Sequence, residues 1–163
     1  MTLMKSCVAV SSAVACALLS SAMAAEQAAP APGSPGVYVD HAVIAAELAK
    51  SVAAAKNPAV APISLTDQYL INRVRRTQPA PPAAHPGWTE LHLILDGSAT
   101  FVTGGQITTK NGESVITGGV MHKVQKGDAV IVPANSPHWY QRIDGEINVV
   151  EVRFIAPTAK DER

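Results

Sequence analysis

Two stretches of this chain decide its fold: His85-Pro-Gly-Trp-Thr-Glu-Leu-His-Leu-Ile-Leu-Asp-Gly97 and Gly127-Asp-Ala-Val-Ile-Val-Pro-Ala-Asn-Ser-Pro-His-Trp-Tyr140. Each contains a short apolar run that ends at turn residues, which is typical of a β-strand. Side chains alternate between the two faces of a strand. The first stretch therefore predicts one face with Glu90, His92 and Ile94 and an opposite face with Leu91, Leu93 and Leu95.

The same two stretches gather groups that bind metals. His85, Glu90 and His92 belong to the first, and His138 belongs to the second, where it shares a face with Tyr140. Imidazole and carboxylate ligands suit divalent ions of the first transition row. The sequence therefore predicts one divalent metal ion, Fe, Mn, Ni or Zn, with His85, Glu90, His92 and His138 as candidate ligands.

The spacing of these residues resembles the two motifs of the cupin superfamily. Glu90 precedes Gly97 by six intervening residues, as in the first motif, and Gly127, Pro133 and His138 follow with gaps of five and four, as in the second. The resemblance extends over about residues 66–156, and residues 95–105 and 132–140 look like small single-domain bacterial cupins. It implies an all-β fold, the cupin double-stranded β-helix or jelly-roll barrel. It also implies a metal held by two or three His and one Glu, with Glu90 and His138 among the ligands.

The first motif departs from the family pattern, in which two histidines separated by one residue precede the glutamate. With the usual gap, His85 is the second of the pair and Ala83 occupies the position of the first. With a shorter gap, His85 is the first and Gly87 occupies the second position. One usual ligand is missing in either alignment, and His92 would supply the nitrogen or line the pocket.

Other side chains would border a substrate pocket. Tyr140 points the same way as His138, and Trp88 lies close to His85 in sequence. Arg73, Arg75 and Arg76 are expected to be solvated, but one of them, with Arg73 as the candidate, could point into the barrel mouth and bind a carboxylate on the ligand. Tyr140, Trp88 and Arg73 are therefore the candidate pocket residues. His122 is expected to be an ordinary sheet histidine.

The first 24 residues have the features of a cleaved export signal. Lys5 provides the positive charge, residues 7–19 are apolar or small, and Ala22-Met23-Ala24 is a typical cleavage site. Both cysteines of the chain, Cys7 and Cys16, lie inside this segment, so the mature protein would contain no thiol ligand or nucleophile. We expect a periplasmic or secreted protein without a membrane span after cleavage.

The remaining chain divides by composition. Residues 25–36 are rich in Pro, Ala and Gly and predict a linker. Residues 37–60 predict a helical segment with Asp40 as N-cap, a helix over residues 41–55 and a Pro-containing connection over 59–64. Residues 61–157 form the predicted cupin β-barrel, with a first long strand over 66–76, and residues 158–163 form a tail.

Short strands separated by turn signals predict a barrel or sandwich over residues 61–157. Asp96-Gly97, Gly104-Gly105, Asn111-Gly112, Gly118-Gly119 and Asp144-Gly145 are the expected turns.

The balance of charged residues limits the kinds of binding partner. Thirteen basic and thirteen acidic side chains cancel, so nucleic acid is not expected as a partner. The chain could be a small metal-dependent enzyme such as a dioxygenase or isomerase. Alternatively, it could be a non-catalytic binding or sensing module with a degenerate metal site, or a protein that retains only the fold. An uncovered Leu91, Leu93 and Leu95 face would favour a homodimer.

Overall fold

The structure, a computed structural model, describes residues 33 and 35–156. The predicted signal, nearly all of the linker and the predicted tail lie outside these residues. One helix and eight strands are present over the described part of the chain: α1 His41–Ala53, β1 Ala59–Leu65, β2 Tyr69–Arg76, β3 Thr89–Thr103, β4 Gln106–Lys110, β5 Glu113–Thr117, β6 Val120–Gln125, β7 Ala129–Val132 and β8 His138–Phe154. The predicted all-β fold with a short N-terminal helix is confirmed.

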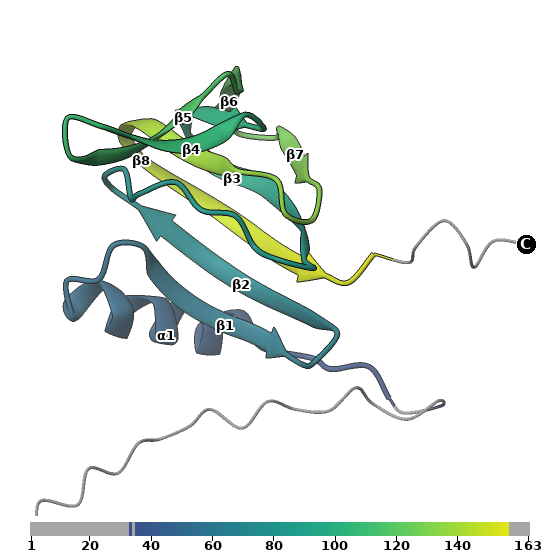
Figure 1. The fold of residues 1–163 in the computed structure, drawn as a ribbon. Helices are drawn as coiled ribbons and strands as arrows, with labels where there is room; N and C mark the ends of the chain where they lie inside the picture. Colours follow the sequence, from purple (N-terminus) through teal and green to yellow (C-terminus); the bar gives the residue numbers. More distant parts are fainter. Residues whose placement is uncertain (1–32, 34, 157–163) are drawn as a thin grey trace, which may run out of the picture.

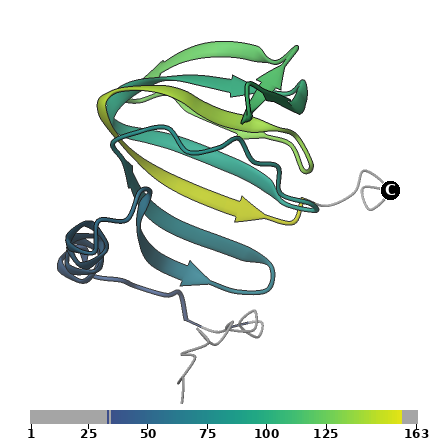
Figure 2. The same cartoon turned by 60° about the vertical axis from the view of Figure 1, so that its left-hand side comes forward.

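The long strands β3 and β8 organise the fold. The main sheet is antiparallel in the order β1-β2-β8-β3-β6, and β7 pairs with the first part of β3. Figure 2 shows β3 and β8 bending so that the sheet folds over itself and encloses an interior. The separate β4–β5 hairpin turns at Asn111 and Gly112, whose φ angles of 53° and 83° fit the tight turn predicted for this pair.

The helix begins where the sequence predicts. The side chain of Asp40 accepts a hydrogen bond from the backbone nitrogen of Ala42 at 2.7 Å, which caps the first turn. The helix ends at Ala53, two residues before the predicted end, and Ala55 adopts a left-handed φ of 53° that a helix cannot continue. The helix packs mainly against β1 and makes a smaller contact with β2, so it does not cover β3 (Figure 1).

The predicted connection over residues 59–64 is wrong, because these residues form β1. Pro62 was the reason for expecting a loop, since proline cannot donate to a sheet ladder. However, β1 lies at the edge of the sheet, and its register shifts between Pro62 and Ser64. An edge strand with a bulge accommodates proline, so β2 is the second strand rather than the first.

Two predicted turns are also wrong. Asp96-Gly97 lies inside β3, and Asp144-Gly145 lies inside β8. The strand pairing shifts register on both sides of Gly97, which marks a bulged bend instead of a hairpin. The glycines therefore bend the two long strands without ending them.

Gly97 provides a test of this bend. Its φ is +81°, and an added Cβ would overlap the carbonyl oxygen of Glu146 on β8. Gly104 has a similar φ of +72°, yet nothing lies within 4 Å of the position of its Cβ. Both Gly→Ala substitutions carry the left-handed backbone cost of about 1–2 kcal/mol. We expect Gly97→Ala to lower the free energy of unfolding by about 1–3 kcal/mol more, because it also overpacks the strand crossing.

Urea denaturation of the two variants measures this difference. If the m-values of the variants are equal, the midpoints report the difference in the free energy of unfolding. Equal losses in Gly97→Ala and Gly104→Ala would contradict a close strand contact at Gly97.

The apolar core fills one end of the folded sheet. Phe101, Ile94, Ile147 and Val149 are at most 1% exposed, and Val74 and Val132 pack with them. Glu90 and His92 share the inward face with Ile94, whereas Leu91 and Leu95 are half-buried and Leu93 is exposed. The predicted alternation along β3 is confirmed. It places a carboxylate and an imidazole inside the barrel next to aliphatic side chains.

Candidate metal centre

A cavity of about 220 Å³ opens beside the polar end of the interior. Its walls come mainly from β2, β3, β8 and the Pro-rich loop that precedes β3. The lining residues are Arg76, Ala80, Pro81, Ala83, His85, Glu90, His92, His138, Trp139, Tyr140, Glu151 and Arg153. The two long strands therefore supply most of the functional groups from a rigid sheet.

His85 reaches this cavity from the loop, and backbone hydrogen bonds hold it there. The backbone nitrogen of Ala83 donates to the carbonyl of His138 at 3.0 Å, and that of His138 donates back at 2.8 Å. The backbone nitrogen of Asn135 donates to the carbonyl of His85 at 3.2 Å. The loop is thus tied to the strand that carries His138.

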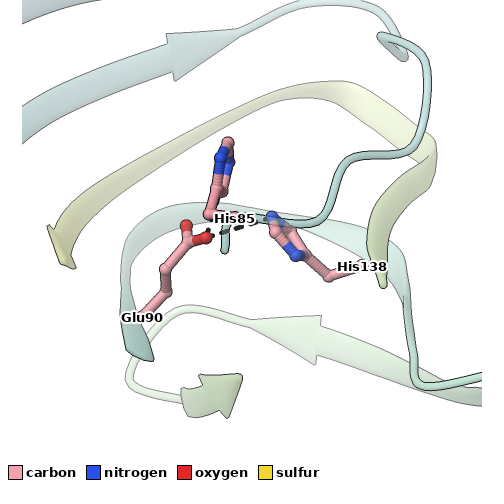
Figure 3. Close-up of side chains that lie close together, drawn as sticks. All are labelled: His85, Glu90 and His138. Carbon is pink, nitrogen blue, oxygen red and sulfur yellow. Dashed lines mark ion pairs between the residues drawn. The ribbon is translucent and has the colours of Figure 1, made fainter. Parts of the chain in front are cut away.

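His85, Glu90 and His138 converge on one point. One ligand atom from each lies within 4.8 Å of the others (Figure 3). The Nε2 atoms of His85 and His138 lie 3.5 and 3.6 Å from the same carboxylate oxygen, Oε1 of Glu90. Two imidazole nitrogens and one carboxylate oxygen are a donor set that divalent transition metals bind. The cluster could therefore hold a metal ion.

His92 lies on the other side of the same carboxylate. Its Nε2 is 3.4 Å from Oε2 of Glu90. This atom is buried and forms no hydrogen bond with the residues that the structure describes. Its Nδ1 lies 3.2 Å from the hydroxyl of Tyr140 and 3.7 Å from Oε1 of Glu151. A buried nitrogen without a partner is costly in a folded protein, so an additional group beside Glu90 would satisfy it.

The two tautomers of His92 suit two different roles. If Tyr140 donates to Nδ1, then Nε2 carries the proton and faces the carboxylate of Glu90 as a donor. If Nδ1 carries the proton, it faces Glu151 and Tyr140, and Nε2 has a free lone pair for a metal. The alternatives left open by the sequence, ligand or pocket wall, correspond to these two proton positions.

Glu90 is 1% exposed and surrounded by positive or hydrogen-bonding groups. Nε of Arg153, its cross-strand partner on β8, donates to Oε2 at 3.2 Å. Burial alone would raise the pKa of Glu90. The neighbouring His92, His138, Arg153 and His85 outweigh this effect and lower the pKa to about 2. The carboxylate is therefore ionised and ready to act as a ligand at neutral pH.

The two histidines of the cluster are held in their neutral form. Burial lowers the pKa of His85 and of His138, and this effect exceeds the opposing attraction of Glu90. A neutral imidazole is the form that binds metals. The environment thus favours the protonation states that a metal site needs on all three residues.

A second ion pair lies deeper in the cavity. Nη2 of Arg76 lies 2.7 Å from Oε1 of Glu151, and the guanidinium carbon stacks 5.1 Å from the centre of the Tyr140 ring. Arg76 lowers the pKa of Glu151 despite its burial, and burial raises the pKa of Tyr140, whose phenol stays protonated. Nε of Arg76 is buried without a hydrogen-bond partner among the described residues.

The structure changes part of the predicted pocket. Arg73 does not line the cavity, because it alternates with the inward-facing Val74 and instead donates to the carbonyl of Val149 and to Asn148. Trp88 is also absent from the cavity wall, whereas Tyr140 lines it. His122 lies on β6 and is exposed, away from the cluster.

Sequence reasoning missed Glu151 and Arg153, and it named Arg76 only as one of three arginines of which one could face the barrel mouth. Their signal was available, since each occupies an inward position on a strand where apolar residues are expected. Arg76 follows Val74 by two residues, and Glu151 and Arg153 follow Val149 at the same spacing. Charged residues at inward positions of a barrel strand usually serve a site.

Comparison with known families matches residues 74–152 to the family described as Cupin domain. The matched segment lies within the region that carried the resemblance and contains the complete set of candidate ligands. Residues 74–152 therefore belong to the cupin domain family. Among curated proteins, none matches it.

Solved structures with a similar fold include the TT1209 protein of Thermus thermophilus, with 16% identity and a TM-score of 0.47 over 62% of this chain and 86% of that chain. A cupin superfamily protein of Desulfitobacterium hafniense has 18% identity and a TM-score of 0.43 over 62% and 82%. The DMSP lyase DddQ of Ruegeria pomeroyi has 19% identity and a TM-score of 0.43. The matched region covers 60% of this chain and 42% of that chain.

Within the described residues, no helix is both long enough and apolar enough to cross a membrane.

Proposed function

We propose that this protein binds one divalent transition metal ion through His85, Glu90 and His138, and that it acts as a small metal-dependent enzyme on an oxygen-containing molecule. The observation that carries the proposal is the convergence of these three side chains within 4.8 Å in a lined cavity. Nε2 of His92, which is buried beside Glu90, has no hydrogen-bond partner among the residues that the structure describes. This supports the proposal, because a buried polar atom needs a partner.

Such an ion would polarise a coordinated oxygen or activate O₂, depending on its identity. The protein residues divide the remaining tasks. Glu90 presents Oε1 to the cluster while Arg153 engages Oε2, which fixes the carboxylate in one orientation. The protonated phenol of Tyr140 can donate a hydrogen bond within the cavity. Trp139 also lines the cavity, and its indole nitrogen donates to the carbonyl of Ala80 at 2.7 Å.

Elemental analysis of the purified, full-length protein tests the proposal most directly. We expect about one equivalent of Fe, Mn, Ni or Zn per chain, and recovery of that content when metal-free protein is titrated with Zn²⁺. A chain that retains no ion after titration would contradict a metal-dependent function.

A second candidate is a non-catalytic module that binds or senses a small organic molecule without metal. Arg153 already pairs with Glu90 at 3.2 Å, so an ion-pair network alone could balance this carboxylate. The histidine missing from the first motif, at Ala83 or at Gly87 depending on the alignment, also favours this alternative. Retention of a small molecule through purification, without a stoichiometric ion, would distinguish it from the enzyme.

The pH dependence of metal binding follows from the site. Protons compete with the ion only where His85 and His138 become charged, and burial lowers both pKa values from the ordinary value of about 6.5. The affinity for Zn²⁺ should therefore stay constant down to below about pH 6.5 and then fall, with a limiting slope of about two protons per ion. Glu90 adds no proton in this range, because its pKa is about 2.

Calorimetric titration of metal-free protein with Zn²⁺ from pH 5 to pH 8 measures this profile. A decline that begins above pH 6.5 would show that the two imidazoles are not held neutral by burial.

Export and assembly also remain proposals. We infer cleavage after Ala24 and a periplasmic or secreted location from the N-terminal sequence, and the N-terminal sequence of protein from its native host would decide this. A homodimer is proposed because α1 packs on β1 and β2 and leaves Leu93 exposed. A monomeric mass by light scattering would count against it.

A further inference from the structure

We propose that the cavity binds a small carboxylate anion and that Arg153 is the side chain that pairs with its carboxylate group. This inference rests on the proposed metal site, because the charge of the ion creates the need for an anion. It assigns a ligand class and a recognition residue to the cavity.

The charges of the cavity wall support an anionic ligand. Four ionised side chains line it, namely Arg76, Glu90, Glu151 and Arg153, and their formal charges cancel. A divalent ion at His85, Glu90 and His138 would leave a net charge of +2 in a partly enclosed space. An uncompensated charge of this kind is costly away from water, so the site would favour a ligand that carries negative charge.

Arg153 is suited to pair with that ligand. Its Nε contacts Oε2 of Glu90, and within the described part of the chain this is the one nitrogen of its guanidinium with a protein acceptor. The side chain is 27% exposed, so the rest of its donor edge is accessible. A guanidinium has five N–H donors in a planar fork that matches a carboxylate. Arg153 can therefore hold Glu90 and a ligand at the same time.

Arg76 has a different role. Its Nη2 is engaged by Glu151, and its side chain is only 14% exposed. Its Nε is buried and has no hydrogen-bond partner within the described part of the chain. Arg76 therefore adds positive charge behind the ligand, while the accessible Arg153 makes the direct contact.

The cavity volume limits the size of the anion. At about 220 Å³ it is smaller than the roughly 300–1,000 Å³ of sites that take drug-sized molecules. Ala80, Pro81 and Ala83 form a short apolar part of the wall. The ligand should therefore be a small carboxylate of a few carbon atoms, such as a hydroxy or keto acid.

The test uses full-length protein loaded with Zn²⁺, and glycolate and its neutral amide, glycolamide, are the probes. Calorimetry should show glycolate binding at least about tenfold more tightly than glycolamide, and little preference in the metal-free protein. Zinc itself attracts carboxylates, so substitutions of the arginine are needed to assign the contact. Equal binding of glycolate and glycolamide to the zinc-loaded protein would overturn the carboxylate proposal and leave the metal site intact.

Arg153→Met should weaken glycolate binding by about ten- to a hundredfold, the range for a charge-assisted hydrogen bond. The same change removes the partner that holds Oε2 of Glu90, so glycolate binding is measured at a Zn²⁺ concentration that saturates each variant. Circular dichroism spectra equal to those of the unmodified protein show that the fold is retained. Arg153→Lys keeps the pair with Glu90 but loses the planar fork, and it should weaken glycolate to an intermediate degree.

Arg142 provides the matched control. It lies on the same strand, is exposed and pairs with Asp144 away from the cavity. Arg142→Met should change neither glycolate nor Zn²⁺ binding. Unchanged glycolate affinity in folded Arg153→Met would overturn the role of Arg153. Failure of the unmodified protein to bind Zn²⁺ would overturn both this inference and the proposed function.

Discussion

Replacement of His138 by alanine should abolish stoichiometric metal binding. His138 supplies a nitrogen 3.6 Å from Oε1 of Glu90, and it is one of only two imidazoles in the three-residue cluster. Loss of a residue that only supports a metal ligand costs about 10–100-fold in affinity. Removal of a direct ligand should exceed this, so His138→Ala should retain little metal after dialysis against a fixed Zn²⁺ concentration.

The fold should survive this change, because the apolar core is built without the ion. His122→Ala is the matched control, since His122 is an exposed histidine on β6 and should not affect metal content. Equal occupancy in His138→Ala and the unmodified protein would rule out this site. Loss in His85→Ala but not in His92→Ala would place His92 in the pocket wall, whereas loss in both would make it a ligand.

Replacement of Phe101 by alanine should give the largest loss of stability. Phe101 is 0% exposed at the centre of the core. Its ring lies 4.5 Å from the Tyr140 ring and 5.1 Å from the His92 ring, measured between centroids. Phe→Ala substitutions in cores cost about 3–5 kcal/mol. A cavity at this position would also remove the support beneath His92 and His138, so the affinity for Zn²⁺ should fall in any folded fraction.

Urea denaturation, compared at equal m-values, measures the effect. Ile107→Ala is the control, because Ile107 is 41% exposed on β4 and its loss should cost only about 0.5 kcal/mol. A cost below about 1.5 kcal/mol for Phe101→Ala would contradict the tight packing around this ring.

The sequence was sufficient to predict the residues at the centre of the candidate site. Glu90 and His138 could be assigned because turn glycines and a proline stand at fixed distances from them, and period-two alternation places Glu90 and His92 inside the barrel. The cap at Asp40 and the Asn111-Gly112 hairpin were also predictable, since both depend on contacts between residues adjacent in sequence.

Features that depend on distant segments were not predictable. Asp96-Gly97 resembles a hairpin turn locally, but the backbone of β8 packs against Gly97 and keeps β3 continuous. Pro62 resembles a loop residue until its strand is known to lie at the sheet edge.

The attachment of the Pro-rich loop bears on how quickly a ligand ion could be exchanged. Ala83 and His138 are joined by two reciprocal backbone hydrogen bonds, so the segment that carries His85 is fastened to the strand that carries His138. When these two bonds and the bond from the backbone nitrogen of Asn135 to the carbonyl of His85 break, His85 can leave the cluster while β3 and β8 stay paired. The rate of metal release should therefore follow a local opening of this loop, which requires less free energy than global unfolding of the barrel.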